Sequence, residues 1–201
     1  MMLTKNQFRY IIIYNSCSSG MKRILFIIFL FIFVSKGLIY ASYSIASDSS
    51  SMKNETVSYD LAYPGILPDN PLYILKTLRD RIVSILINDP LKKAEFDLLT
   101  SDKRLYAGYF LVNKNKPGLA IVSISKSNNY FFEAINNLSE AKKMGESTNS
   151  LASRMKLSVQ KHEEMLRNIE KPMGEKYKDQ LSFEYQRLVD FETSINSLLT
   201  K

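Results

Sequence analysis

The single histidine, His162, is the first residue to test for chemistry, because imidazole serves both acid–base catalysis and metal binding. It lies on an apolar line of a predicted helix, between Val159 and Leu166. A di-iron bundle needs Glu-x-x-His on paired helices, but residue 159 is valine and the chain has no second histidine. The zinc-binding helix motif also needs another histidine, four residues on. We therefore expect a core histidine, no metal site and no cofactor.

Motifs for nucleophilic or phosphate chemistry are missing from the chain. A Ser-His-Asp set is compatible with the composition, but no Gly-x-Ser-x-Gly turn is present to hold a nucleophile. Residues 114–118 lack the glycine, lysine and serine spacing of a phosphate-binding loop. Glu163 and Glu164 are consecutive, so they point to different sides of a helix. The sequence therefore predicts no catalytic residue and no enzymatic activity.

Tyr73, Lys76 and Arg79 have two interpretations. In the structural one, they belong to a helix start, where caps and charged residues are common. The cations of the charged group Lys76, Arg79, Asp80 and Arg81 then pair with acidic residues of the next helix, namely Glu95, Asp97 or Asp102. Exposed pairs of this kind contribute ~0–1 kcal/mol each, so they fix register more than stability. In the functional interpretation, Tyr73, Lys76 and Arg79 bind an anionic ligand.

Tyrosine is frequent in the second part of the chain. The residues concerned are Tyr63, Tyr73, Tyr106, Tyr109, Tyr130, Tyr177 and Tyr185. A groove lined by them would bind sugars or peptides, whereas packing at the edge of the core needs no ligand. We favour packing, because tyrosine suits the boundary between core and solvent.

The elements that must position these residues are helices. A cap followed by proline opens each of the first two, at Asn70-Pro71 and at Asp89-Pro90. They run to about residues 88 and 113. The apolar stripe of the first comprises Leu72, Leu75, Leu78, Ile82 and Ile85. The inner face of the second comprises Leu91, Ala94, Leu98, Leu105, Tyr109 and Val112.

Three more helices follow a break at residues 115–118, over about residues 119–144, 147–171 and 176–199. Their predicted inner residues are Ile121, Ile124, Phe131, Ile135, Leu138, Ala141; Leu151, Met155, Val159, His162, Leu166, Ile169; and Leu181, Tyr185, Leu188, Ile195, Leu198. Short loops favour antiparallel neighbours. We therefore expect an all-α domain at residues 61–201, an antiparallel bundle of four to five helices preceded by a proline-rich extended strap at 61–71.

The segments 63–81, 88–95 and 102–105 carry a pattern of their own. It reads P-G-x-x-P-D-x-P-x-Y-x-L-K, then D-P-x-K-x-A-E, then K-R-L. This pattern resembles an uncharacterised bacterial family with a helical domain of unknown function, whose members look secreted or membrane-attached. The match fades after Asn115. The resemblance implies a helical extracytoplasmic module, and it implies no catalytic residue.

Residues 1–46 predict an export segment. Lys22 and Arg23 precede eleven uninterrupted apolar residues at 24–34, which is the charged and apolar part of a secretory signal. Small residues up to Ala46 offer a cleavage site. Without cleavage, residues 24–46 are long enough to anchor the chain in a membrane. Two localisations stay open: secreted or periplasmic after cleavage, or membrane-anchored.

Features around this segment refine the prediction. Met21 makes a better start than Met1, because the basic pair then becomes N-terminal. Cys17 precedes the apolar run instead of following it, so a lipoprotein is not expected. Cys17 is also the only cysteine, which leaves the later chain without a disulfide. Residues 47–60 are polar and serine-rich, and they indicate a flexible linker.

Charge argues against nucleic acid as a partner. The chain has a net charge of +7, but five of its 27 basic residues and none of its 20 acidic residues precede residue 47. The remainder is therefore near +2. The basic balance mostly reflects targeting, so it does not indicate binding to nucleic acid.

The sequence therefore predicts a non-enzymatic helical module of the bacterial cell envelope, with a protein-interaction or scaffold role. Its partner is an unknown envelope protein. The alternatives are a sensor or carrier bundle that binds a small ligand between helices, and an envelope hydrolase. An exposed apolar patch would favour the first function, and a cavity with convergent polar groups would favour the second.

Overall fold

Five α-helices and one 3-10 turn make up the regular structure of residues 57–200, which are the residues that the computed structural model describes. The helices are α3 (Tyr73–Leu86), α4 (Pro90–Asn113), α5 (Pro117–Lys143), α6 (Asn149–Met173) and α7 (Lys178–Leu199), with η1 (Glu175–Tyr177) before α7. No strand occurs in this part of the chain, so the prediction of an all-α fold is confirmed for it. The predicted export segment and most of the predicted linker lie outside the described residues.

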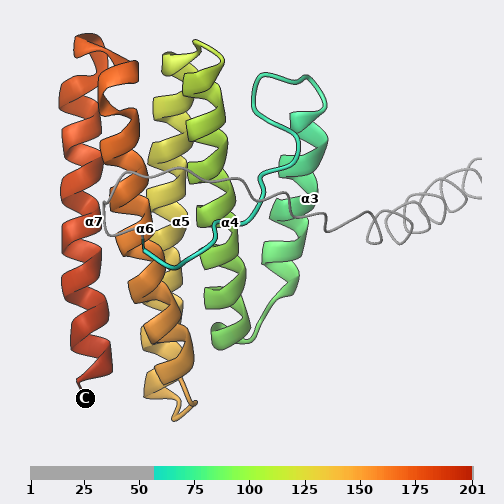
Figure 1. Ribbon diagram of the computed structural model, residues 1–201. Helices are drawn as coiled ribbons and strands as arrows, with labels where there is room; N and C mark the ends of the chain where they lie inside the picture. Colours follow the sequence, from blue (N-terminus) through green and yellow to red (C-terminus); the bar gives the residue numbers. More distant parts are fainter. Residues whose placement is uncertain (1–56, 201) are drawn as a thin grey trace, which may run out of the picture. The chain divides into compact units, whose positions relative to one another are not determined.

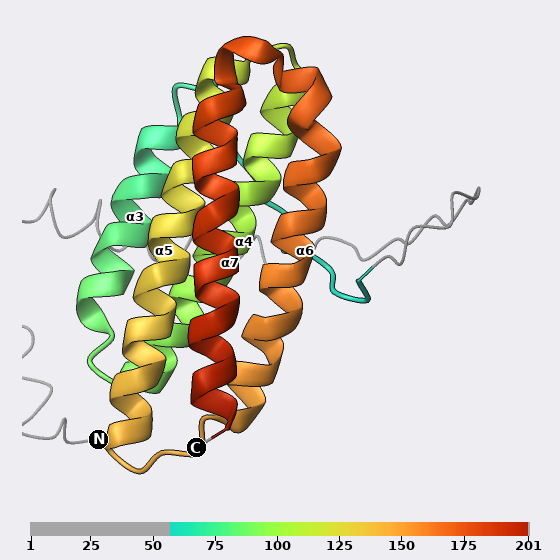
Figure 2. The same cartoon turned by 90° about the vertical axis from the view of Figure 1, so that its left-hand side faces the viewer.

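Helices α4 to α7 form a four-helix bundle made of two antiparallel hairpins, α4–α5 and α6–α7 (Figure 1). The hairpins pack with α4 beside α6 and α5 beside α7, and α7 lies between α5 and α6 in Figure 2. Cross-helix bonds give the directions, because Glu95 meets Arg154 and Asp102 meets His162, so α4 and α6 run parallel. The consecutive helices α5 and α6 are diagonal to each other, whereas a simple up-and-down order would make them neighbours.

The bundle core follows the predicted apolar periodicity. Every position predicted to face inward on α5 and α6 is buried, including Phe131 and Met155. On α4 and α7 most predicted positions are buried, while four are partly buried: Leu91, Tyr109, Tyr185 and Leu198. Burying one such aliphatic or aromatic side chain contributes roughly 1.5–3 kcal/mol. The core therefore accounts for why these four helices stay together.

The start of α4 follows the local capping rule, whereas the starts of α3 and α5 differ from the predicted bounds. Asp89 Oδ1 accepts the Lys92 amide at 3.1 Å, and Pro90 is the first helical residue, as predicted. α5 begins at Pro117, so placing this proline in a break was wrong; proline is favoured in a first turn because the missing N–H needs no partner there. α3 begins at Tyr73, after the Asn70 side chain accepts the Leu72 amide at 2.9 Å.

α3 packs differently from the other helices, at the edge of the bundle beside α4 (Figure 1). None of its residues is buried. Its apolar side chains expose between 37% and 73% of their surfaces: Ile74, Leu75, Leu78, Ile82, Val83, Ile85 and Leu86. The partly buried residues are instead polar or aromatic: Tyr73, Lys76, Thr77, Asp80 and Ser84. The expectation that this helix buries its apolar stripe in the bundle is therefore wrong, because α3 turns its polar face inward.

Residues 57–71 run along the bundle without regular structure and are held by side-chain contacts. Tyr59 donates its hydroxyl to Asp102 at 2.6 Å. The ring of Tyr63 meets the Phe110 ring edge-on at a centroid distance of 6.1 Å. Asp69 accepts hydrogen bonds from two lysines of the α4–α5 turn, at 2.9 and 3.2 Å. These contacts fix the entry of the chain into α3.

Candidate functional site

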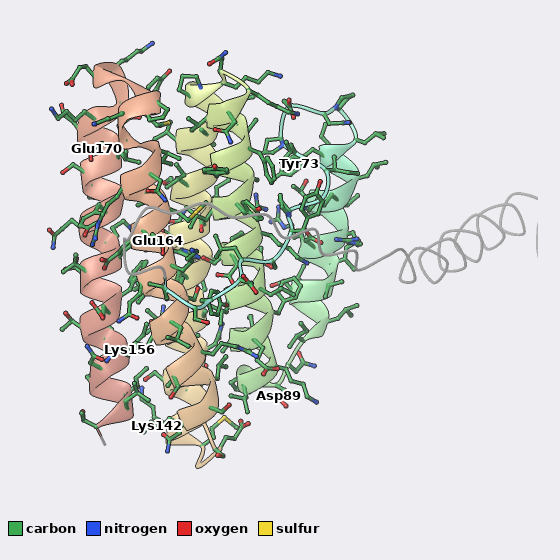
Figure 3. All side chains as sticks on the ribbon, viewed as in Figure 1. Tyr73, Asp89, Lys142, Lys156, Glu164 and Glu170 are labelled. Atoms are coloured by element: carbon green, nitrogen blue, oxygen red, sulfur yellow. The ribbon has the colours of Figure 1, made fainter. Side chains whose placement is uncertain are left out.

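A cleft between α3 and α4 brings together the residues for which the sequence suggested an anionic ligand. Tyr73, Lys76 and Arg79 line a cavity of about 220 Å³. α4 supplies Lys103 and Arg104 from the opposite wall. Figure 3 places Tyr73 near the start of α3, at the opposite end of this helix from Asp89. Apolar side chains complete the lining: Val83, Phe96 and Leu99.

Arg104 is the most firmly held cation of the cleft. Its Nη1 donates to the Tyr73 hydroxyl at 2.6 Å, which links α4 to α3. Its guanidinium also lies over the Tyr130 ring, 4.9 Å from the centroid. Such a cation–π contact orients the group without neutralising its charge. The Nε atom is buried and has no hydrogen-bond partner among the residues that the structure describes.

Lys76 is held by the chain that precedes α3. Its Nζ donates to the Pro64 carbonyl at 2.5 Å and approaches the Ile66 carbonyl at 3.4 Å. Burial lowers the pKa of Lys76, and the neighbouring cations Arg104, Lys103 and Arg79 lower it further, against the opposing effect of Asp80. Desolvation likewise raises the pKa of Tyr73. The cleft is therefore a partly dry site in which positive charge lacks compensation.

The charge balance of the cleft is unequal. Four cationic side chains line it, and Asp80 is its only carboxylate. Asp80 is engaged by Arg79, with Nη2 and Oδ1 2.7 Å apart. The ammonium group of Lys103 has neither an ion pair nor a hydrogen bond to any described residue. Elsewhere in residues 57–200, several cations are matched: Lys114 and Lys116 with Asp69, Arg154 with Glu95, Arg167 with Glu163, and Arg187 with Glu184.

The predicted pairing of α3 cations with Glu95, Asp97 or Asp102 is wrong. Glu95 pairs with Arg154 of α6 at 3.3 Å. Asp97 is buried and accepts the Asn137 amide of α5 at 2.9 Å. Asp102 points into the bundle. The α4 face that these acids occupy is turned toward α5 and α6, so it cannot meet α3.

A second polar cluster lies inside the bundle around Asp102. Its Oδ1 accepts from Ser158 at 2.7 Å and from His162 Nε2 at 2.9 Å, and its Oδ2 accepts from Tyr59. This arrangement is not that of a catalytic triad. In a triad the serine hydroxyl bonds to the imidazole, whereas here the hydroxyl and the imidazole both bond to the carboxylate. Ser158 and His162 are both fully buried. The cluster therefore pairs the Asp102 carboxylate inside the core, and His162 is a core residue as predicted, although its Nδ1 is buried without a hydrogen-bond partner among the described residues.

The tyrosines do not share one groove in the described part of the chain. Tyr63, Tyr106 and Tyr109 gather around Phe110 with ring centroids 4.8–6.1 Å apart. Tyr73 and Tyr130 flank Arg104 instead. Tyr185 accepts from Arg167 at the other side of the bundle, at 2.7 Å. This distribution agrees with packing at the core edge, except at the cleft.

No group of three or more His, Cys, Asp or Glu side chains in residues 57–200 is placed to hold a metal ion. None of the described helices combines the length and the apolar character that a membrane crossing requires. Comparison of the chain with protein-family models, curated proteins and solved structures finds no match. The function has to be inferred from the chain's own residues.

Two residues of the cleft, Lys103 and Arg104, were not identified from the sequence as binding residues. They appear there only as part of the K-R-L motif. Their position opposite Tyr73 depends on how α3 folds back onto α4. No local pattern specifies that register, because the apolar stripe of α3 faces away from α4 and a polar contact, from Arg104 to Tyr73, links the two helices.

Proposed function

We propose that this chain is a non-enzymatic helical module of the bacterial cell envelope that acts by contact with an envelope protein. The N-terminal segment carries it beyond the inner membrane, either released by cleavage or anchored through residues 24–46. The resemblance of residues 63–105 to an extracytoplasmic helical family supports the same placement. No nucleic acid, metal or cofactor takes part.

The observation that carries this proposal is the outward apolar face of α3. Six aliphatic residues of α3 face solvent, while the polar face of the same helix faces the bundle: Ile74, Leu75, Leu78, Ile82, Ile85 and Leu86. Scattered apolar residues on a surface are ordinary, but a contiguous apolar face marks a site of contact. The burial of Ser158, His162 and Asp102 supports a module without catalytic machinery.

Photo-crosslinking in intact cells tests the contact. A photoreactive amino acid at Ile85, on the outward face of α3, is expected to yield one discrete crosslinked product. The same amino acid at Lys126, an exposed residue of α5, is the matched control and is expected to yield none. Absence of a product at Ile85, or the same products at both positions, contradicts the proposal.

Fractionation tests the placement separately. The protein is expected in the envelope or outside the cell, and N-terminal sequencing of the mature chain distinguishes release from anchoring. A start just after Ala46 means cleavage, and an intact Met21 means an anchor. Recovery of the complete chain, leader included, from the cytosol contradicts the localisation.

Ligand binding is the second candidate function, and the α3–α4 cleft favours it. The cleft combines an apolar lining with several converging polar groups, which is the usual make-up of a small-ligand site. It lies on the inward side of α3, so binding there and contact through the outward face are compatible.

A further inference from the structure

We propose that the cleft between α3 and α4 binds a phosphate group, held by Lys76, Arg79, Lys103 and Arg104. This inference goes beyond contact through the outward face of α3, and it does not depend on that contact. The shared chemistry is a phosphate anion, supplied either free in solution or by the headgroup of a phospholipid.

The cleft carries an excess of positive charge. Two guanidinium and two ammonium groups line one cavity of about 220 Å³, against a single carboxylate that Arg79 already engages. Like charges in a partly desolvated cleft repel one another more strongly than they do in water. An anion in the cavity relieves this repulsion. The volume suffices for a small anion, since roughly 10–15 Å³ of such space already holds one water molecule.

Two cations of the cleft, Arg104 and Lys76, are preorganised by contacts within the protein. Arg104 is fixed between the rings of Tyr73 and Tyr130 and by its bond to the Tyr73 hydroxyl. Its buried Nε has no hydrogen-bond partner among the described residues, so the guanidinium keeps an unpaired donor. The Pro64 carbonyl holds the Lys76 ammonium at the same cleft. Less side-chain entropy is therefore lost when a ligand binds.

The number of donors in the cleft favours a phosphate over a carboxylate. One guanidinium fork satisfies both oxygens of a carboxylate. Two guanidinium groups and two ammonium groups offer more donors than a carboxylate accepts, and they match the several charged oxygens of a phosphate. The apolar lining by Val83, Phe96 and Leu99 suits the hydrocarbon next to a lipid headgroup.

The bound anion would also link α3 to the bundle. In the described residues, the direct hydrogen bond between α3 and α4 runs from Arg104 to Tyr73. Lys76 and Arg79 belong to α3, whereas Lys103 and Arg104 belong to α4. A phosphate that accepts hydrogen bonds from both pairs would bridge the two helices at the level of Tyr73.

Calorimetric titration of the full chain in uncharged detergent tests the site with two probes. The first probe is inorganic phosphate, titrated against sodium chloride at equal ionic strength. The second is phosphatidic acid, added to the same micelles. Saturable heat with either probe is expected, and the probe that binds identifies the source of the phosphate.

Paired lysine variants separate a specific site from general attraction. Lys103→Gln removes a cation without a partner in the described residues, so the fold should be unaffected, and binding is expected to weaken at least about tenfold. Lys126→Gln removes an exposed lysine of α5 and is expected to change affinity less than twofold. Circular dichroism verifies that both variants are folded. Absence of binding with both probes, or equal effects of the two substitutions, overturns the proposal.

Discussion

At the scale of single residues, Asp97 shows how the bundle tolerates a buried acid. The side chain is almost fully buried, and its one hydrogen bond comes from the neutral amide of Asn137. Desolvation therefore raises the pKa of Asp97 from 3.8 to about 6, with the hydrogen bond acting in the opposite direction. The folded state binds the proton more tightly than the unfolded state does between these two values. The protonated Asp97 side chain therefore contributes its full share of the unfolding free energy below the unfolded-state pKa of 3.8. This contribution is lost as the pH rises to the folded-state pKa of about 6.

Asp97→Asn is expected to remove this pH dependence. The asparagine stays neutral and its side-chain oxygen can still accept from Asn137. Relative to the variant, the wild-type chain should lose up to about 3 kcal/mol of unfolding free energy between about pH 4 and pH 7. Urea denaturation at several pH values measures the difference. Asp190→Asn, at an exposed position of α7, should leave the pH profile unchanged. A constant difference between wild type and Asp97→Asn across this range would contradict the argument.

Asp102 should matter for folding more than any single group that donates to it. Replacing it with alanine leaves Ser158, His162 and Tyr59 without their shared acceptor. Each buried donor that is left without an acceptor costs about 1–3 kcal/mol, so the loss of all three bonds should cost several kcal/mol. Ser158→Ala removes only one donor and should cost about 1 kcal/mol. Chemical denaturation at neutral pH compares the two variants, and equal losses would mean that Asp102 is not the centre of the cluster.

At the scale of elements, apolar periodicity predicted α4 to α7 because burial imposes that periodicity. Residues such as Ile124 and Leu138 recur at helical spacing and meet the core. Periodicity alone does not say which side of an amphipathic helix meets the bundle. α3 has an equally regular stripe, from Leu75 to Ile85, and turns it outward. The direction follows from the polar contacts of Tyr73 and Lys76, which depend on the tertiary arrangement.

The same limit explains how much of the candidate site the sequence predicted. Tyr73, Lys76 and Arg79 were identified from one helix start, because they are close in the chain. The acids expected to pair with them were misassigned, because α4 presents Asp97 and Asp102 to other helices. To predict a site that two helices form together, one must know which face each helix turns toward the other. The spacing of residues within one helix does not give this information.

Gly108 sets how closely α4 approaches α5. A Cβ added at this position would lie 2.9 Å from Ile124 Cγ1 and 3.4 Å from the Ala120 carbonyl oxygen. Alanine gains about 1 kcal/mol of helix propensity, but overpacking a core contact costs about 1–3 kcal/mol. Gly108→Ala should therefore lower the melting temperature. Gly118→Ala meets only the Tyr177 hydroxyl at 3.2 Å and should have a smaller effect. Thermal denaturation compares them; a more stable Gly108→Ala variant would show that α4 and α5 separate easily.

At the scale of the whole molecule, stability should be unevenly distributed between α3 and the bundle. α3 buries no residue, whereas α7, also at an end of the described chain, buries Leu188, Phe191 and Ile195. Local opening needs less free energy where few apolar contacts are lost. Amide hydrogen exchange of the purified full chain should therefore be at least about 100-fold faster in α3 than in the middle of α7. Equal protection of the two helices would contradict this expectation, and it would mean that the apolar face of α3 is already covered in solution.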